Sequence, residues 1–264
     1  MLAAWDHEPM KKNEDLDTEL QRRGDARDAL IWLGARGEFT RSAATTIDGL
    51  ETGVRILTAT RLRQAQLQIA RPDARVASCV PDAGENELDA LKCAGGEQGV
   101  QWAVMSLHDA VEAGLGGLVA EAVDVGVLMP APLQAAPAGW SLESAREREH
   151  DNQLTTDDVL LACEAAVAEY LKGTEHLEGH VKAPVGCLAT GTEVPASGAA
   201  GAGAADAGAA VRVAVNVLVT NGSRTLRQRA AGRIEIQGVG SLIQAQELGR
   251  RAAQALLDAG AASL

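Results

Sequence analysis

Aromatic side chains are scarce in this chain, at 2% of its 264 residues: four Trp, one Tyr and one Phe. Stacking platforms for nucleic-acid bases or sugar rings are therefore almost absent. Positive charge is also in short supply, because 24 Lys and Arg stand against 36 Asp and Glu, a formal net charge of −12. General nucleic-acid binding and binding to an anionic membrane surface both need a positive field, so the composition disfavours both functions.

Long apolar runs and paired cysteines are missing as well. No run approaches the roughly 20 residues that span a bilayer, and the acidic opening residues do not resemble a secretory or transit peptide. The cysteines do not form a C-x-x-C pair, which disfavours a zinc knuckle or a thioredoxin-type site; they are Cys79, Cys93, Cys163 and Cys187. We therefore expect a cytoplasmic protein whose thiols are free.

The first half of the chain alternates strand and helix patterns. Residues 1–24 form a charged arm, and the apolar run at 28–33 predicts a buried strand. The elements expected next are a strand at 54–58, a helix at 61–70, a strand at 75–80, a helix at 85–93 closed by Gly95-Gly96, and a strand at 100–105. This order predicts an α/β domain over 56–125 with βαβ units and a parallel sheet.

Residues 126–150 contain three prolines and predict a linker or loop, after which the pattern changes. A small antiparallel sheet with two helices is expected, an α+β domain over 150–264 with an Ala/Gly-rich loop at 196–210. Its elements are a helix from 156 to Gly173, a strand at 185–190, a strand of alternating valines at 211–219, an Asn221-Gly222 turn, one or two strands at 225–236 and a helix at 241–259.

Two local patterns suggest ligands but favour ordinary structure. His176, Glu178 and His180 have the spacing i, i+2, i+4 with a glycine between them, and a third metal ligand is not evident nearby, so we interpret the segment as a loop and assign no metal site. The glycine clusters at 114–117 and 238–240 lack the spacing of a phosphate-binding loop and predict turns.

A third pattern lies where the predicted strand at 54–58 meets the predicted helix at 61–70. Arg63, together with the hydroxyls of Thr58 and Thr60 and the first N–H groups of the helix, is suited to bind carboxylates. The alternative is an ordinary exposed helix face, which the spacing alone favours.

The same residues carry a family resemblance. Residues 58–67 read T-A-T-R-L-R-Q-A-Q-L and residues 70–73 read A-R-P-D. They resemble the hydroxymethylbilane synthase (porphobilinogen deaminase) family, which has G-T-S-S-L-R-R-Q-A-Q-L followed by R-P-D. Residues 25–30, D-A-R-D-A-L, and 177–186, L-E-G-H-V-K-A-P-V-G, resemble that family's D-P-R-D-A-L and L-E-G-G-C-Q-V-P-I-G in the same order.

The resemblance implies three domains, two of them α/β around an active site and a third, α+β, that carries a cysteine. It also implies the condensation of four porphobilinogen molecules with loss of ammonia, in tetrapyrrole (porphyrin and heme) biosynthesis. A dipyrromethane cofactor on the cysteine primes this transferase reaction. Arginines bind the acetate and propionate groups, and an aspartate stabilises the cationic pyrroles. Porphobilinogen or a related acidic pyrrole is the expected ligand.

The chain departs from the family in several places. The family segments T-R-x-S-x-L-A and K-D-x-P, the second of which holds the catalytic aspartate, have no match here. We therefore expect an N-terminally truncated, divergent relative and assign no catalytic residue. Residues 25–55 and 126–145 are expected to be the remnant of an incomplete first α/β domain, without their sheet unless a partner chain completes it.

Further departures concern the cofactor and the substrate. Val181 occupies the place of the cofactor cysteine, and Cys187 is a weak substitute six residues later. Leu62 replaces the first of two paired arginines, whereas Arg63 keeps the second. We expect the dipyrromethane to be unattached and turnover impaired, with Thr58, Thr60 and Arg63 as substrate-binding residues. The alternatives are a non-catalytic relative, a pseudoenzyme that binds pyrroles or a partner chain, and a product without function.

Overall fold

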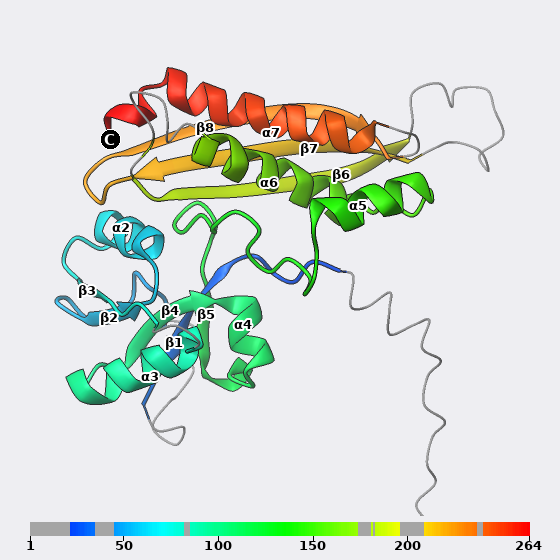
Figure 1. Cartoon of the computed structure of the whole chain (residues 1–264). Coiled ribbons are helices and arrows are strands. Elements are labelled where there is room, and N and C mark those ends of the chain that lie inside the picture. The colour runs from blue at the N-terminus through cyan, green and yellow to red at the C-terminus, as the bar shows by residue number, and fades with distance from the viewer. Residues whose placement is uncertain are drawn as a thin grey trace, which may run out of the picture.

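The computed structural model describes residues 22–34, 45–81, 85–173, 181, 183–195, 209–236 and 240–264. The chain forms two units, each built around its own sheet (Figure 1). The first unit contains β1 (Asp28–Trp32), β2 (Arg55–Thr58), α2 (Arg61–Ala70), β3 (Arg75–Ser78), α3 (Glu87–Gln98), β4 (Trp102–Ser106), α4 (Leu107–Glu112), η2 (Gly116–Leu118) and β5 (Val119–Ala122). The second contains α5 (Leu142–His150), α6 (Thr156–Gly173), β6 (Val185–Pro195), β7 (Ala209–Thr220), β8 (Thr225–Glu235), α7 (Ser241–Asp258) and η4 (Ala261–Ser263).

The first sheet has the strand order β3-β2-β4-β1-β5. Strand β2 pairs in parallel with β3 and β4, which confirms the predicted βαβ arrangement. Strand β1 is antiparallel to both β4 and β5. The sheet is therefore mixed, and the prediction of a parallel sheet is correct only for its β3-β2-β4 half.

Strand β1 corrects the expectation that the early residues lack a sheet. It lies between β4 and β5, with Leu30 opposite Val104 of β4. Ala29 and Ile31 contribute to the core under α3 and α4, whereas Leu30 contributes to the core under α2. A strand buried on both faces needs an unbroken apolar run, which is why residues 28–32 join this sheet. The proposed domain boundaries stay a prediction.

Two helices differ from their predictions. Helix α3 runs to Gln98 and ends at Gly99, whose φ of 63° suits glycine. Gly95 therefore lies inside the helix, where a Cβ would approach Leu33 and the Val100 carbonyl oxygen, so it permits close packing on the sheet. Helix α5 lies in the predicted linker and begins at a capping box formed by Ser141 and Ser144.

The second unit matches its sequence pattern closely. The alternating valines of β7 all point into one core, which α6 and α7 cover as neighbours on one face of the β6-β7-β8 sheet (Figure 1). Asn221 and Gly222 form the β7–β8 turn, as predicted. Residues 225–235 are a single strand. Residues 1–21 of the predicted arm, the His176–His180 pattern and residues 196–208 of the Ala/Gly-rich loop lie outside the described residues.

The two units meet through the connection that follows β5. Gln66 of α2 both accepts a hydrogen bond from the Met129 N–H, at 2.8 Å, and donates one to its carbonyl oxygen, at 2.9 Å. Leu62, Met129 and Leu218 then form a small apolar cluster between α2 and the far face of β7. Within the described ranges, none of the helices combines the length and hydropathy needed to cross a membrane.

The packing of α6 against α7 gives a stability test at Gly249. A Cβ there would lie 2.2 Å from the Cys163 carbonyl oxygen and 3.0 Å from Ala166 Cβ. Gly249→Ala should therefore lower the free energy of unfolding by about 1–3 kcal/mol, as overpacking does, although Gly→Ala normally favours a helix. Chemical denaturation followed by circular dichroism measures the change.

The matched control is Gly96→Ala, in the exposed part of α3, where an added Cβ meets nothing within 4 Å. It should raise the free energy of unfolding by about 0.5–1 kcal/mol. Equal effects of the two substitutions would contradict the close helix contact.

Candidate functional site

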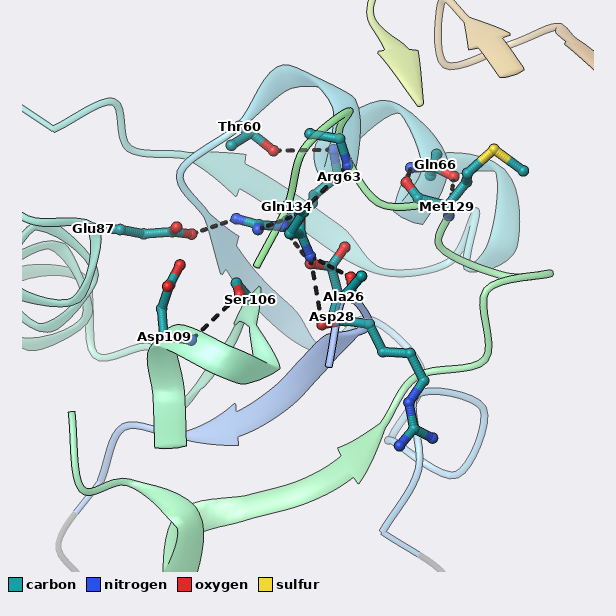
Figure 2. Close-up of polar contacts among 12 residues, drawn as sticks. Ala26, Asp28, Thr60, Arg63, Gln66, Glu87, Ser106, Asp109, Met129 and Gln134 are labelled. Atoms are coloured by element: carbon teal, nitrogen blue, oxygen red, sulfur yellow. Dashed lines mark hydrogen bonds and ion pairs between the residues drawn. The ribbon is translucent and has the colours of Figure 1, made fainter. Parts of the chain in front are cut away.

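The candidate site lies where the parallel strands of the first sheet end and the following helices begin, the usual ligand position in open α/β sheets. Thr58 ends β2, and Thr60 caps α2 by accepting a hydrogen bond from the Arg63 N–H. Asn86 caps α3 in the same way, and Ser106 ends β4 and caps α4. Figure 2 shows the side chains that gather between these ends.

Arg63 is the centre of this group. Its guanidinium donates from Nε to Asp28 Oδ1 at 2.9 Å and from Nη1 to Glu87 Oε1 at 2.5 Å. The side chains of Arg63 and Asp28 are only 6% and 1% exposed, whereas that of Glu87 is 21% exposed. The arginine that the sequence offers for a ligand carboxylate is therefore bound by two carboxylates of the chain itself.

Gln134 orients this ion pair. Its Nε2 donates to Asp28 Oδ1 and to the Ala26 carbonyl oxygen, both at 2.8 Å, and its Oε1 accepts from Arg63 Nη2 at 3.3 Å (Figure 2). The neighbours Leu133 and Ala135 have φ of 64° and 59°, a left-handed conformation that non-glycine residues rarely adopt. Such strained residues are more frequent at functional sites and switch regions. Here the two strained residues flank Gln134, whose amide contacts the ion pair.

Negative charge exceeds positive charge around Arg63. Burial raises the pKa of Asp28 above its ordinary value, and the charge of Arg63 opposes part of that rise. Burial likewise raises the pKa of Glu87, and the charge of Asp109 adds to the rise. Asp109 is exposed and lies beside Glu87 (Figure 2). Three carboxylates therefore surround one guanidinium, an environment that favours an added cation or proton.

Three buried oxygen atoms at the first unit's strand ends lack a hydrogen-bond partner among the described residues: Asp28 Oδ2, Thr58 Oγ1 and Ser78 Oγ. Thr58 and Ser78 are opposite each other at the ends of β2 and β3. Buried polar atoms are normally paired. These oxygens therefore give the site unused hydrogen-bonding capacity.

The predicted substrate-binding residues Thr58, Thr60 and Arg63 all lie at the β2–α2 junction. Thr60 is occupied as a helix cap and Arg63 is held by carboxylates, whereas the Thr58 hydroxyl has no hydrogen-bond partner among the described residues. Pattern reading missed Asp28, Glu87 and Gln134. An acidic residue at the start of an apolar run was a signal for Asp28, but nothing in the Pro/Ala-rich segment singled out Gln134.

The two positions considered for cofactor attachment lie in the second unit. Val181 packs its hydrocarbon side chain against that unit's core and carries no nucleophile. Cys187 is fully buried in β6, and burial raises the pKa of its thiol well above the ordinary value. A thiolate is the nucleophilic form of cysteine, so these two side chains do not fit a thioether-linked dipyrromethane.

A second buried ion pair adjoins the site. Arg23 donates from both terminal nitrogens to Glu164 of α6, at 2.7 and 3.0 Å, and also to the Gln134 carbonyl oxygen. Glu164 further accepts the N–H groups of Leu133 and Ala189, each at 2.8 Å. Gln134 therefore joins the Arg63 cluster to the second unit through its side chain and its backbone.

Comparison with known proteins supports the resemblance found in the sequence. The chain is 29% identical to a porphobilinogen deaminase of Cutibacterium acnes over 249 residues, which cover 92% of this chain and 69% of that protein. None of the family models matches the chain. This similarity supports the family resemblance at most.

Removing the central cation tests the cluster. Arg63→Gln leaves Asp28 and Glu87 without their guanidinium, so the free energy of unfolding should fall by about 3–5 kcal/mol. The control is Arg61→Gln on the exposed face of the same helix, which should change it by less than about 0.5 kcal/mol. Denaturant unfolding compares the two variants, and similar losses would contradict a structural ion cluster.

The acidity of this cluster gives a separate pH test. The pKa values of Asp28 and Glu87 are raised in the folded state, so in the window above their unfolded values the folded chain binds more protons. Their contribution to stability therefore falls as pH rises through that window. In Arg63→Gln the pKa values of Asp28 and Glu87 rise further. The loss in free energy of unfolding relative to the parent chain should therefore be smaller at about pH 5 than at about pH 7.5. A loss in free energy of unfolding that is the same at both pH values would contradict the raised pKa values of Asp28 and Glu87.

Proposed function

We propose that this chain is a divergent member of the porphobilinogen deaminase family that binds porphobilinogen or a related acidic pyrrole without carrying a covalent primer. One observation carries the proposal. The retained α2 motif places Arg63 at the expected junction, but Asp28 and Glu87 already neutralise it. The site therefore favours the cationic end of a ligand over its carboxylates.

The chemistry of the proposed ligand agrees with a site that favours a cationic group. Porphobilinogen loses ammonia on condensation, so it carries an amine that is a cation at neutral pH. The partly exposed Glu87 and the exposed Asp109 lie in front of the buried pair and offer that amine two carboxylates. The buried Asp28 Oδ2, which has no hydrogen-bond partner among the described residues, is available for a proton.

Without a covalently attached primer, the proposed function is the binding of a pyrrole and does not include the growth of a pyrrole chain. Condensation in the family starts from a covalently held dipyrromethane, and neither Val181 nor buried Cys187 offers a reactive thiolate. We infer that the chain binds a single pyrrole unit and does not release ammonia from it. The alternative is an active synthase, which the buried carboxylate of Asp28 would support by stabilising a cationic pyrrole.

The test uses the purified full-length chain. Its intact mass should equal that of the polypeptide, and porphobilinogen should bind in calorimetry without ammonia release above the blank. Glu87→Gln should weaken this binding roughly tenfold, because it removes one charged hydrogen-bond acceptor. The control Glu97→Gln, at the exposed end of α3, should leave binding within about twofold.

Each other result has a defined meaning. A mass increase corresponding to a dipyrromethane, or porphyrin formed from porphobilinogen, would establish the active synthase instead. Absence of binding at millimolar porphobilinogen would reject the ligand class. Equal effects of the Glu87 and Glu97 substitutions on binding would show that porphobilinogen does not bind at the Arg63 cluster.

A further inference from the structure

The open face of the second sheet carries a concentration of positive charge. Strands β7 and β8 contain Arg212, Arg227, Arg229 and Arg233, in a chain whose net charge is −12. Arg212 alternates with valines that pack under α6 and α7, so it belongs to the opposite face of the sheet. Register places Arg212 directly opposite Arg233 and Asn216 opposite Arg229.

Three of these arginines border a cavity of about 530 Å³, which we call the arginine trough. Arg212 and Arg233 lie at one end and Arg229 at the other, four residues along β8, or about 13 Å by strand rise. The floor between them consists of small side chains, Ala214 and Ala231, and Thr190 adds a hydroxyl. None of the described residues that line the trough is acidic.

The charges of the trough are incompletely neutralised within the described part of the chain. Arg233 pairs with Glu235 at 3.1 Å and donates to the Pro195 carbonyl oxygen. Arg212 and Arg229 are exposed, and their side chains have neither a hydrogen bond nor an ion pair with any described residue. Like charges directly opposite across a sheet are unfavourable, so an anion between Arg212 and Arg233 would remove a repulsion as well as gain hydrogen bonds.

We propose that the arginine trough is a binding site for a small organic polycarboxylate. Guanidinium groups bind carboxylates through two parallel hydrogen bonds. A pair of arginines at one end of the trough and a single arginine at the other call for at least two carboxylates on one molecule. Phosphate sites usually add backbone N–H groups from a helix start or a nest. The central strand β7 pairs on both sides along the trough, so its N–H groups are used by the sheet.

This site is separate from the Arg63 cluster and does not depend on the function proposed above. The Arg63 cluster has three carboxylates around one guanidinium, whereas the trough has three guanidinium groups and no lining carboxylate. The two sites therefore prefer ligand groups of opposite charge.

The experiment is calorimetric titration of the full-length chain with citrate at low ionic strength. Acetate is the monocarboxylate comparison and pyrophosphate is the phosphate comparison. Citrate should bind at least roughly tenfold more tightly than either. Binding of acetate as tight as that of citrate would overturn the requirement for two carboxylates, and tighter binding of pyrophosphate would overturn the carboxylate assignment.

Variants then locate the binding. Arg212→Gln and Arg229→Gln should each weaken citrate binding roughly tenfold, and both alter exposed side chains, so the fold should persist. Arg224→Gln removes the same charge from the exposed β7–β8 turn outside the trough, and should change binding less than about twofold. An equal effect of Arg212→Gln and Arg224→Gln on citrate binding would mean that citrate responds only to the net charge of the chain. That result would overturn the proposed site.

A variant that fills the trough tests the binding site without changing its charge. Ala231→Phe fills the floor of the trough without altering any arginine, and should weaken citrate binding at least roughly tenfold while its melting curve stays cooperative. In the parent chain, citrate should perturb backbone amide resonances of β7 and β8 and leave those of α2 and α3 unchanged. Perturbation confined to α2 and α3 would overturn the proposal.

Discussion

Two buried arginines meet at Gln134, and the arrangement of the two units depends on this meeting. Arg63 contacts the Gln134 side chain and Arg23 contacts its carbonyl oxygen. The two arginines then reach Asp28 in the first unit and Glu164 in the second. A buried charge without its partner is strongly unfavourable, so Gln134 holds the turn that satisfies both pairs. The left-handed backbone at Leu133 and Ala135 is the local strain that this arrangement imposes.

This dependence explains why the site is rigid around its cation. Desolvation of Asp28, Glu164 and Arg63 is offset only if their hydrogen bonds are nearly complete, and Glu164 does receive two backbone N–H groups in addition to Arg23. Asp28 is less complete, since its Oδ2 has no partner among the described residues. Among the described residues of the network, Asp28 is therefore the carboxylate with an oxygen atom left to take up a proton.

The sequence predicted the elements whose signal is local. The bounds of α2 follow from Thr60, the apolar spacing and Pro72, and β7 follows from its alternating valines. It did not predict that β1 inserts beside β4, because strand order depends on pairing across more than 70 residues of chain. Nor did it predict the partner of Arg63, since Asp28, Glu87 and Gln134 meet only once three distant segments have folded together.

The distribution of charge distinguishes the strand ends of the first sheet from the β6-β7-β8 sheet. At the strand ends, Arg63 is enclosed by the chain's own carboxylates. Guanidinium groups without a partner among the described residues lie instead on the face of the second sheet away from α6 and α7, at Arg212 and Arg229. The oriented Gln134 and the two carboxylates bound to Arg63 therefore make this junction a site that favours an added cation or proton.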